Sequence, residues 1–444
     1  MKPLETHKRL IRFISAYGLL LLDVAVYWIF WTGHFNQMIE FPFWRRGNWL
    51  MAALYGVLLA FFFHTYGGFR IGYLKKNNLI CSQMLSVVWV NILTYLQISL
   101  IDKRFHNPGT MLIMTACEFL LGFLWTTLFQ AINQHLFPPR RLLLVYGQRP
   151  AFHLMEKVHS RKDKYWLAGS ADIRIGIGKI MELAGAYDGV IVGDLPSEDR
   201  NELLKLCYQR DIRTYAVPKI SDILLRTSSE LDIFDSPLLL SRNDGLSRDQ
   251  EIIKRCIDIL FSTVGLILTS PFFLLIAASI KLTDGGPVFY KQTRLTKNRK
   301  VFHIYKFRTM IQDAERKEGP RLASEGDDRI LPVGRLLRRT RLDELPQLFN
   351  ILRGDMTLVG PRPERPELAA EIEADIPEFC FRLKVKAGLT GYAQVYGKYN
   401  TSSYDKLKLD LTYIRNYSLL LDLKLILMTP KVMLLKESTE GVKE

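Results

Sequence analysis

Four long and almost uncharged segments in the first third of the chain constrain its fold more than any other feature. They cover residues 13–31, 49–69, 79–101 and 110–137. The only formally charged residues within them are Asp23 and Glu118. Each segment is long enough to cross about 30 Å of hydrocarbon as an α-helix. A secretory signal peptide would have a shorter apolar core, a small-residue cleavage site and no further spans after it. We therefore expect residues 1–138 to form a four-helix transmembrane bundle that keeps its first segment.

Basic residues in the short flanks predict the orientation of these helices. Lys8 and Arg12 precede the first segment, and Arg140 and Arg141 follow the fourth. Cytoplasmic flanks carry the excess of Lys and Arg, so both ends of the bundle should face the cytoplasm. The two acidic residues inside the segments favour hydrogen bonding between helices over a proton or substrate path, although both remain open.

Length and composition narrow the classes of protein further. A chain of 444 residues exceeds what one hydrophobic core usually supports, so two or three units are expected. The formal net charge of +15 suits anionic lipid, phosphate-rich substrates or nucleic acid, without choosing among them. Five cysteines, none in a CxxC pattern, indicate neither a disulfide framework nor a zinc site.

Residues 139–240 have the pattern of a small α/β domain. We expect strands at 141–147, 187–193 and 213–217 and a helix at 202–210, in a small parallel sheet. The first strand ends in Gly147 and is followed by Gln148-Arg149-Pro150, which lacks the further glycines of a dinucleotide fingerprint. The sequence thus predicts a Rossmann-like domain, and an assembly or regulatory role is favoured over nucleotide binding.

A fifth apolar run covers residues 256–280 and is interrupted by Ser270-Pro271. Proline removes a helical hydrogen bond and clashes with the preceding turn, so we expect a kink midway. One interpretation is a fifth spanning helix with a tolerated proline. A crossing would, however, place the remaining sequence outside the cell, away from a cytoplasmic phosphate substrate. We therefore favour a re-entrant hairpin that enters and leaves on the cytoplasmic side.

Cations outnumber carboxylates between residues 281 and 345. In Lys306-Phe307-Arg308, a strand would direct both cations to one face, with a spacing suited to a diphosphate. A snorkelling strand at the membrane surface would have the same pattern.

Asp343 and Glu344 are adjacent carboxylates within this basic region. We expect both to stay ionised because nearby positive charge lowers the pKa of a carboxyl group. An ionised pair could hold Mg²⁺ or attack phosphorus to form an acyl phosphate. Alternatively, the pair forms only the first turn of a helix over residues 345–352.

Three later stretches carry weaker signals. The prolines of Gly360-Pro361-Arg362-Pro363 stiffen the backbone, so Arg362 could clamp a phosphate. Glycines flank Thr390 in the stretch that runs through Gly391 to Gln394, which could form a tight turn whose N–H groups cradle a phosphate or a uracil edge. Either stretch could equally be an ordinary turn. Residues 404–434 have the spacing of an amphipathic helix lying at the membrane interface.

Taken in order, these motifs resemble the monotopic phosphoglycosyl transferases over about residues 247–437. The set also includes Leu421-Asp422-Leu423-Lys424. The preceding spans and α/β domain look like those of the large bacterial members that start capsule, exopolysaccharide or O-antigen synthesis. The implied fold is a membrane protein with α and α/β parts. It has a four-helix transmembrane bundle (1–138), a Rossmann-like domain (139–240) and a monotopic catalytic domain (247–444) with a re-entrant hairpin at 256–280 and interfacial amphipathic helices.

The resemblance implies transfer of a hexose 1-phosphate from a UDP-sugar to undecaprenyl phosphate, with release of UMP. It assigns the nucleophile to Asp343 and metal binding or tuning to Glu344, with Mg²⁺ as cofactor. The positions that it assigns to substrate binding are Lys306, Arg308, Arg338, Pro361, Arg362, Pro363, Thr390, Gly391, Gln394, Lys398 and Asp422. Lys398 stands where relatives often have Arg, and Lys lacks the bidentate fork.

The resemblance further implies a multi-pass protein of the bacterial inner membrane, in contact with membrane lipids, whose catalytic domain faces the cytoplasm. A homodimer is expected. Alternatives are a non-catalytic scaffold or regulator of polysaccharide assembly and a protein that binds lipid phosphate without chemistry. A nucleic-acid partner is disfavoured because the basic cluster adjoins apolar, interface-like helices.

Overall fold

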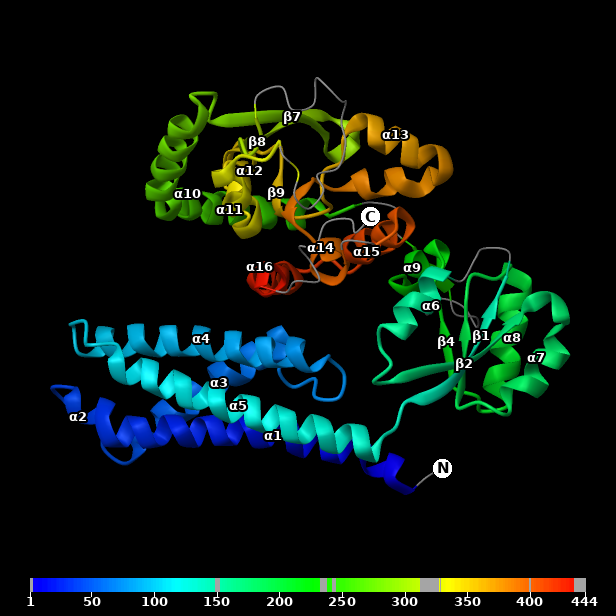
Figure 1. Cartoon of the computed structure of the whole chain (residues 1–444), viewed down its shortest axis with the longest axis horizontal. Helices are drawn as coiled ribbons and strands as arrows, with labels where there is room; N and C mark the ends of the chain where they lie inside the picture. Colours follow the sequence, from blue (N-terminus) through cyan, green and yellow to red (C-terminus); the bar gives the residue numbers. More distant parts are fainter. Residues whose placement is uncertain are drawn as a thin grey trace. The chain divides into compact units, whose positions relative to one another are not determined.

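The computed structural model of the chain describes residues 3–147, 152–231, 238–241, 245–311, 327, 329–398 and 401–434. The chain divides into two compact units, Met1–Lys219 and Ile220–Glu444 (Figure 1), which we describe in turn. The segment Gln148-Arg149-Pro150, on which the interpretation of the first α/β strand partly depends, lies outside the described residues.

Long apolar helices make up the first part of unit one. They are α1 (Pro3–Phe30), which continues through the π-helix η1 (Trp31–Phe35) and α2 (Asn36–Met38), then α3 (Arg46–Tyr66), α4 (Lys76–Ile101) and α5 (Gly109–Leu136). Both α1 and α4 pack against α3 and α5. These four long helices are long and apolar enough to cross a membrane, as the sequence predicts. The chain is a membrane protein.

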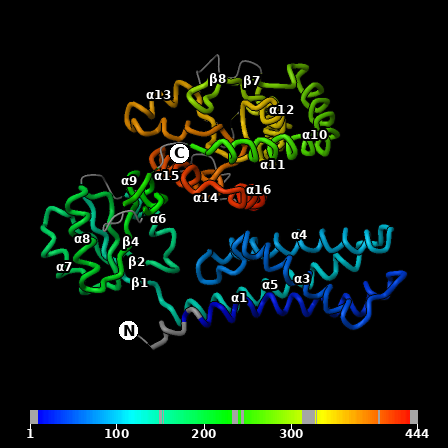
Figure 2. The backbone as a smooth tube through the Cα atoms, turned by 180° about the vertical axis from the view of Figure 1, so that it is seen from behind, coloured from blue at the N-terminus to red at the C-terminus, as the bar shows by residue number. Residues whose placement is uncertain are grey.

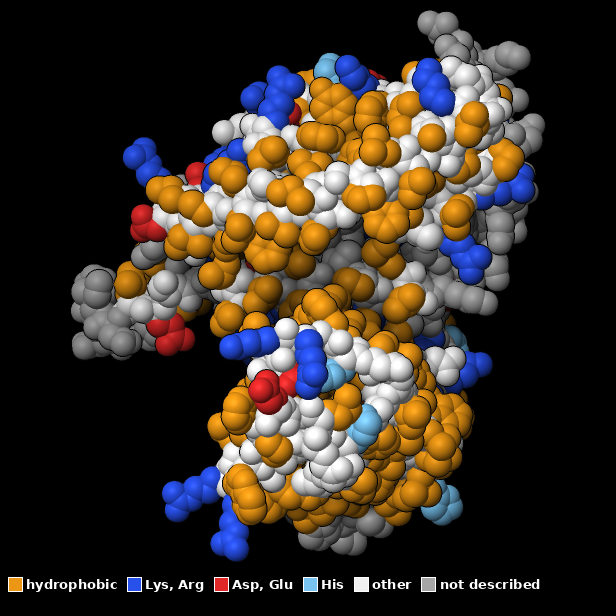
Figure 3. Space-filling view, turned by 90° about the vertical axis from the view of Figure 1, so that its left-hand side faces the viewer, with side chains coloured by type: hydrophobic (Ala, Val, Ile, Leu, Met, Phe, Trp, Pro, Cys, Tyr) orange, Lys and Arg blue, Asp and Glu red, His pale blue; other side chains and the backbone are white. Residues whose placement is uncertain are grey.

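The outer and inner faces of these helices differ in polarity. Large apolar side chains such as Leu21 and Leu100 are exposed, and hydrophobic side chains cover much of the face in Figure 3. Glu118 is buried and accepts hydrogen bonds from the Tyr55 hydroxyl at 2.6 Å and from Asn91 Nδ2 at 2.7 Å. Glu118 therefore joins neighbouring helices, which is the interpretation that the sequence favours.

A parallel sheet forms the rest of unit one, as predicted. Its strands are β1 (Arg140–Tyr146), β2 (Tyr165–Asp172), β3 (Gly189–Val192) and β4 (Thr214–Ala216), in the order β2-β1-β3-β4. Its helices are α6 (Phe152–His159), α7 (Ile177–Ala184) and α8 (Ser197–Gln209), and η2 (Ile173–Ile175) is a short 3₁₀ turn. The strand β2 was not predicted, because its partly buried residues show no regular alternation.

Unit two begins with α9 (Ile220–Arg226), whose Ile220 and Ile223 pack in a core with Phe379 and Leu407. Its other elements are the hairpin strands β5 (Ser229–Leu231) and β6 (Leu238–Leu240), α10 (Arg248–Asp284), β7 (Phe289–Leu295), η3 (Lys297–Arg299), β8 (Val301–Phe307), α11 (Pro332–Thr340), η4 (Leu342–Glu344), α12 (Gln347–Arg353), β9 (Thr357–Val359), α13 (Pro366–Asp375), η5 (Pro377–Lys384), β10 (Gly388–Thr390), α14 (Tyr392–Tyr396), α15 (Ser403–Arg415) and α16 (Leu419–Leu434). The strands β7 and β8 pair antiparallel, and β9 and β10 pair parallel.

The long helix α10 contains the fifth apolar run and Pro271. It begins at a capping box formed by Ser247 and Gln250. Figure 2 shows that α10 changes direction sharply partway along its length. At the proline, the Ser270 hydroxyl donates a hydrogen bond to the Ile267 carbonyl at 2.8 Å. Ile267 lies four residues before Pro271, so the hydroxyl satisfies the acceptor that proline leaves without its N–H partner. The predicted kink is confirmed.

The predicted single helix over residues 404–434 is wrong, because the structure has two helices. α15 ends at Arg415, and the Asn416 side chain donates to the Thr412 carbonyl at 2.8 Å. α16 starts at Leu419, where the backbone N–H of Leu421 donates to the Ser418 hydroxyl. Asn and Ser compete with the helix for backbone hydrogen bonds, which allows the chain to break there.

Candidate active site

The adjacent carboxylates Asp343 and Glu344 lie in the short 3₁₀ turn η4 between α11 and α12. Arg341 ends α11 with a positive φ of 55°, a conformation that residues other than glycine seldom adopt. The chain changes direction at Arg341, so Asp343 and Glu344 lie outside α11. They also do not form the first turn of a helix over residues 345–352, because they occupy a separate turn. α12 begins only at Gln347.

Two cations hold Glu344. Its Oε1 atom lies 3.3 Å from Lys306 Nζ of β8 and 3.1 Å from Arg362 Nη2. The Glu344 side chain is 12% exposed, whereas that of Arg362 is 44% exposed. Burial tends to raise the pKa of Glu344, but Arg362 and Lys306 outweigh it and lower the pKa to about 2. Glu344 is thus a permanent anion that ties two cations together.

Asp343 has a different environment. Burial, followed by repulsion from Glu344, raises its pKa to about 6, against the opposing effects of Lys306, Arg338 and Arg362. The expectation that the cations would lower the pKa holds for Glu344 and is wrong for Asp343, because burial and the neighbouring anion outweigh them. Within the described part of the chain, the Asp343 carboxylate accepts no hydrogen bond. Its oxygen atoms remain available to a substrate or a metal ion.

Arg338 and Arg308, which were also predicted to bind phosphate, have different environments. Arg338 lies near enough to lower the pKa of Asp343, and its Nε donates to the Thr309 hydroxyl at 2.9 Å. Arg308 follows the end of β8 and is 5% exposed. Its guanidinium forms a bidentate pair with Asp284 at the end of α10 and also donates to the Pro287 carbonyl. Lys306 and Arg308 therefore pair with different carboxylates, Glu344 and Asp284.

The backbone of Gly360-Pro361-Arg362-Pro363 runs against that of Gly388 to Gly391. The Gly388 N–H donates to the Pro361 carbonyl at 2.9 Å, and the Gly360 N–H donates to the Thr390 carbonyl at 2.8 Å. A Cβ atom on Gly388 would lie 2.0 Å from Gly360 N, and one on Gly391 would lie 2.1 Å from Gly360 O. These glycines permit close contact between two backbones. Gly388 belongs to β10 and its N–H is bonded to Pro361, so this N–H is not available to a ligand.

Other predicted residues surround this contact. The Thr390 hydroxyl shares a hydrogen bond with that of Thr429 at 2.8 Å, and Gln394 Nε2 donates to the Leu389 carbonyl at 3.1 Å. The Pro363 carbonyl accepts from Arg294 at 3.0 Å. The backbone N–H of Lys398 donates to Thr401 at 2.7 Å. The first three of these contacts stabilise the segments beside Arg362, and none of the four joins the Asp343–Glu344 turn.

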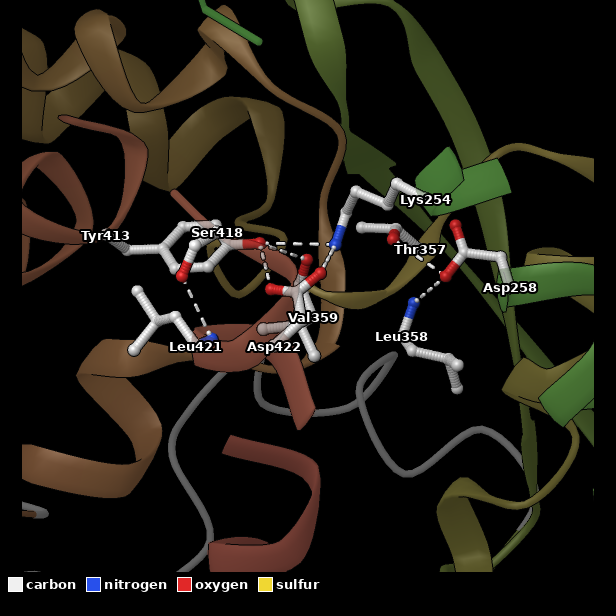
Figure 4. Close-up of polar contacts among 9 residues, drawn as sticks. All are labelled: Lys254, Asp258, Thr357, Leu358, Val359, Tyr413, Ser418, Leu421 and Asp422. Atoms are coloured by element: carbon white, nitrogen blue, oxygen red, sulfur yellow. Dashed lines mark hydrogen bonds and ion pairs between the residues drawn. The ribbon is translucent and has the colours of Figure 1, made fainter. Parts of the chain in front are cut away.

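Asp422 lies apart from the acidic pair, in a buried polar cluster drawn in Figure 4. It forms an ion pair with Lys254 of α10 and lies 2.8 Å from the Tyr413 hydroxyl oxygen. Lys254 and Tyr413 were not predicted. Asp258, the single charged residue within the apolar run 256–280, accepts hydrogen bonds from Thr357 and Leu358. Lys254 and Asp258 are one helical turn apart, which is a signal that the sequence contained.

The fold of unit two and this arrangement of acids and cations agree with a sequence match to a known family. Residues 249–436 match the family described as "Bacterial sugar transferase". The chain is 41% identical over 186 residues to a UDP-glucose:undecaprenyl-phosphate glucose-1-phosphate transferase of Caulobacter vibrioides, covering 40% of the chain and 68% of that protein. It is 38% identical over 192 residues to the exopolysaccharide production protein ExoY of Sinorhizobium fredii, covering 40% of the chain and 84% of that protein. The chain belongs to the bacterial sugar transferase family.

A longer match extends to a UDP-N-acetylgalactosamine-undecaprenyl-phosphate N-acetylgalactosaminephosphotransferase of Aeromonas hydrophila. The two proteins are 36% identical over 263 residues, which is 56% of the chain and 59% of that relative. The chain thus matches less than two thirds of this relative's length.

Proposed function

We propose that the chain transfers a hexose 1-phosphate from a UDP-sugar to undecaprenyl phosphate, releases UMP and thereby initiates synthesis of an exopolysaccharide, capsule or O-antigen. The observation that carries this proposal is the Asp343 carboxylate, which is half-buried and accepts no hydrogen bond from the described residues, beside the Lys306–Glu344–Arg362 group. The names of the matched relatives supply the substrate class.

The reaction follows from the chemistry of Asp343. A carboxylate oxygen attacks the sugar-bearing phosphorus of the UDP-sugar, and the bond from that phosphorus to the bridging oxygen breaks. UMP leaves with the electron pair, and the sugar phosphate stays on Asp343 as an acyl phosphate. An oxygen of undecaprenyl phosphate then attacks the same phosphorus, which releases the Asp343 carboxylate and yields the lipid-linked sugar diphosphate.

The cations near Asp343 stabilise negative charge during both steps. Arg362 is the most exposed member of the group and can offer its remaining N–H donors to the diphosphate. Glu344 holds Lys306 and Arg362 together, which counters their mutual repulsion before the substrate arrives. Arg308 has no part in this proposal, because Asp284 already pairs with its guanidinium.

The acidic pair also suits Mg²⁺. No group of three or more His, Cys, Asp or Glu side chains that could hold a metal ion occurs among the described residues. Mg²⁺ in phosphoryl-transfer sites is, however, usually held by one or two carboxylates together with substrate phosphates. Asp343 has free lone pairs and Glu344 is an anion, so both could hold the ion together with the diphosphate. When bound, Mg²⁺ would neutralise phosphate charge.

Replacement of the nucleophile tests the proposal. Asp343→Asn should fold and lose turnover, whereas the exposed control Asp375→Asn should keep it. Wild-type protein mixed with a UDP-sugar labelled in its sugar phosphate, without acceptor lipid, should retain the label on Asp343. Near-normal UMP release by Asp343→Asn would contradict the mechanism. If the wild-type protein releases UMP from no UDP-sugar in a panel, the scaffold alternative would be favoured.

The topology of the membrane part is a second element of the proposal. We propose that the four helices of unit one form a transmembrane bundle in the bacterial inner membrane, and that α10 is re-entrant with both ends in the cytoplasm. Most of α10 is exposed in the structure, as a membrane-inserted helix requires. Its direction changes partway along its length, and it contains Pro271. A cytoplasmic exit leaves Asp343 accessible to UDP-sugar while the lipid chain stays in the bilayer.

Thiol labelling tests this topology. Asp249→Cys and Lys300→Cys, made singly in a cysteine-free background, lie on the two sides of the apolar run 256–280 and are exposed. Both should be protected from a membrane-impermeant thiol reagent in intact cells and react after lysis. Labelling of the Lys300 position from outside would mean that α10 spans the membrane.

We further propose that the chain is a homodimer and that the Rossmann-like domain serves assembly or regulation. The first strand of that domain ends at Tyr146 and is followed by Gly147, which lies next to Leu195. Mass measurement of the purified protein in detergent, with and without residues 139–219, checks both statements. A monomeric full-length chain would contradict the first.

A further inference from the structure

Three consecutive residues of the strand β9 are bonded to side chains from the helices α10 and α15 (Figure 4). Asp258 Oδ1 of α10 accepts hydrogen bonds from the Thr357 hydroxyl and from the Leu358 N–H, both at 2.9 Å. The Tyr413 hydroxyl oxygen of α15 lies 3.0 Å from the carbonyl oxygen of Val359. On its other edge β9 pairs with β10. A three-residue strand is thus bonded along its whole length.

The Tyr413 hydroxyl is itself held within a buried charge pair. Lys254 Nζ donates to the hydroxyl oxygen at 3.2 Å and pairs with Asp422, and Asp422 Oδ1 lies 2.8 Å from that oxygen. Tyr413 is 1% exposed and Asp422 is 4% exposed. The single hydroxyl proton has two acceptors, the Val359 carbonyl and Asp422. Lys254 and Asp422 therefore fix the hydroxyl next to the end of β9.

The end of β9 leads directly to the active site. Val359 is followed by Gly360-Pro361-Arg362, and this short segment has little freedom, because proline fixes its own φ and restricts the residue before it. The Gly360 N–H and the Pro361 carbonyl are bonded to β10, and Arg382 Nη2 donates to the Arg362 carbonyl at 2.9 Å. This short segment therefore connects Val359 to Arg362, whose guanidinium contacts Glu344.

We propose that Lys254, Asp258 and Tyr413 are positioning residues that set Arg362 against Glu344, through β9. The first half of the membrane helix α10 and the helices α15 and α16 then fix the geometry of the acidic pair. This proposal rests on the proposed function for its kinetic test, although its structural test is independent.

Tyr413→Phe is the most selective perturbation. It keeps the buried ring, which packs edge-on against Tyr417, and removes only the hydroxyl. Tyr417→Phe is a matched control, since the Tyr417 hydroxyl has no hydrogen-bond partner among the described residues and the ring stays near Lys254. Loss of a hydrogen bond of this kind changes an equilibrium by about five- to tenfold. We expect Tyr413→Phe to lower kcat/KM for the UDP-sugar by about this factor, and Tyr417→Phe to leave it unchanged.

A double-mutant cycle separates positioning from general destabilisation. If Tyr413 acts through Arg362, the effect of Tyr413→Phe should fall below about twofold in an Arg362→Ala background, measured with protein in excess over labelled UDP-sugar. At Asp258, Asn keeps an oxygen acceptor and should retain activity, whereas Leu removes it and should not. Equal effects of Tyr413→Phe in both backgrounds would overturn the proposal.

Hydrogen exchange gives a readout that does not need turnover. The backbone amides of residues 357–360, Arg362 and Glu364 should exchange faster in Tyr413→Phe and Asp258→Leu than in wild type and Tyr417→Phe. Unchanged exchange there would overturn the positioning proposal, even if the enzyme is active. Conversely, a wild-type protein that releases no UMP from any UDP-sugar would refute the proposed function, and exchange would still decide whether these residues position Arg362.

Discussion

Formation of the phosphosugar intermediate should slow as the pH falls through about 6, the pKa to which burial and Glu344 raise Asp343. In the proposed mechanism the deprotonated carboxylate is the nucleophile, so the rate should follow its ionised fraction. That fraction is about 90% at pH 7, about half at pH 6 and about 10% at pH 5 for a pKa of about 6. The rate at low UDP-sugar concentration should therefore fall about tenfold between pH 7 and pH 5. An aspartate with its ordinary pKa would lose less than about a tenth of its ionised form over this range.

The assay should follow UMP release without acceptor lipid, because the lipid phosphate itself titrates near neutral pH. Two substitutions should move the acid limb of the pH–rate profile, which is the fall in rate at low pH, in opposite directions. Lys306→Met removes the cation that lowers the pKa of Asp343 most, so the limb should move to higher pH. Glu344→Gln removes the repelling anion, so the limb should move to lower pH. The exposed control Lys300→Met should leave the limb in place. A rate that is flat from pH 5 to pH 7 in wild type, or shifts of the same sign in both variants, would refute this reasoning.

Three further expectations follow from the site and its surroundings. EDTA should stop turnover and Mg²⁺ should restore it, because the diphosphate meets two carboxylates; full activity in chelator would exclude the metal. Gly388→Ala should destabilise unit two by about 1–3 kcal/mol and displace Arg362, because the new Cβ would meet backbone atoms of Gly360. Gly178→Ala, where nothing lies within 4 Å, is the matched control in thermal unfolding. Arg382→Ala should cost about 3–5 kcal/mol in unfolding free energy, because it leaves Asp410 buried without its partner, and a loss below about 1 kcal/mol would contradict this.

Local sequence was sufficient for features that depend on composition and spacing. Hydropathy predicts the apolar segments, and the run of apolar residues predicts the strand before Gly147. The missing N–H of Pro271 predicts the kink in α10, and the structure agrees with all three. The basic surroundings of Asp343 and Glu344 could also be predicted, since the two residues are adjacent in the sequence and lie among cations.

Features that depend on distant contacts could not be predicted. The two carboxyl groups share one basic surrounding in the sequence, but their pKa values differ because burial and the position of Arg362 differ between them. Arg308 has the spacing of a phosphate ligand, and only the fold brings Asp284 to it. The ion pair of Lys254 and Asp422 joins the start of α10 to α16. The two residues are 168 positions apart in the sequence, so no local pattern indicates the pair.

The helix α10 is anchored on both sides of Pro271, by Asp258 to β9 and by Asp284 to Arg308. Each inserted residue rotates the following part of a helix by about 100° and advances it by about 1.5 Å. One added or deleted residue between the anchors would therefore turn one carboxylate away from its partner, even if the apolar surface were fully preserved. The length of this helical segment is for that reason a fixed dimension of the enzyme, and chimaeras that exchange it with relatives should tolerate changes of side chain but not of residue number.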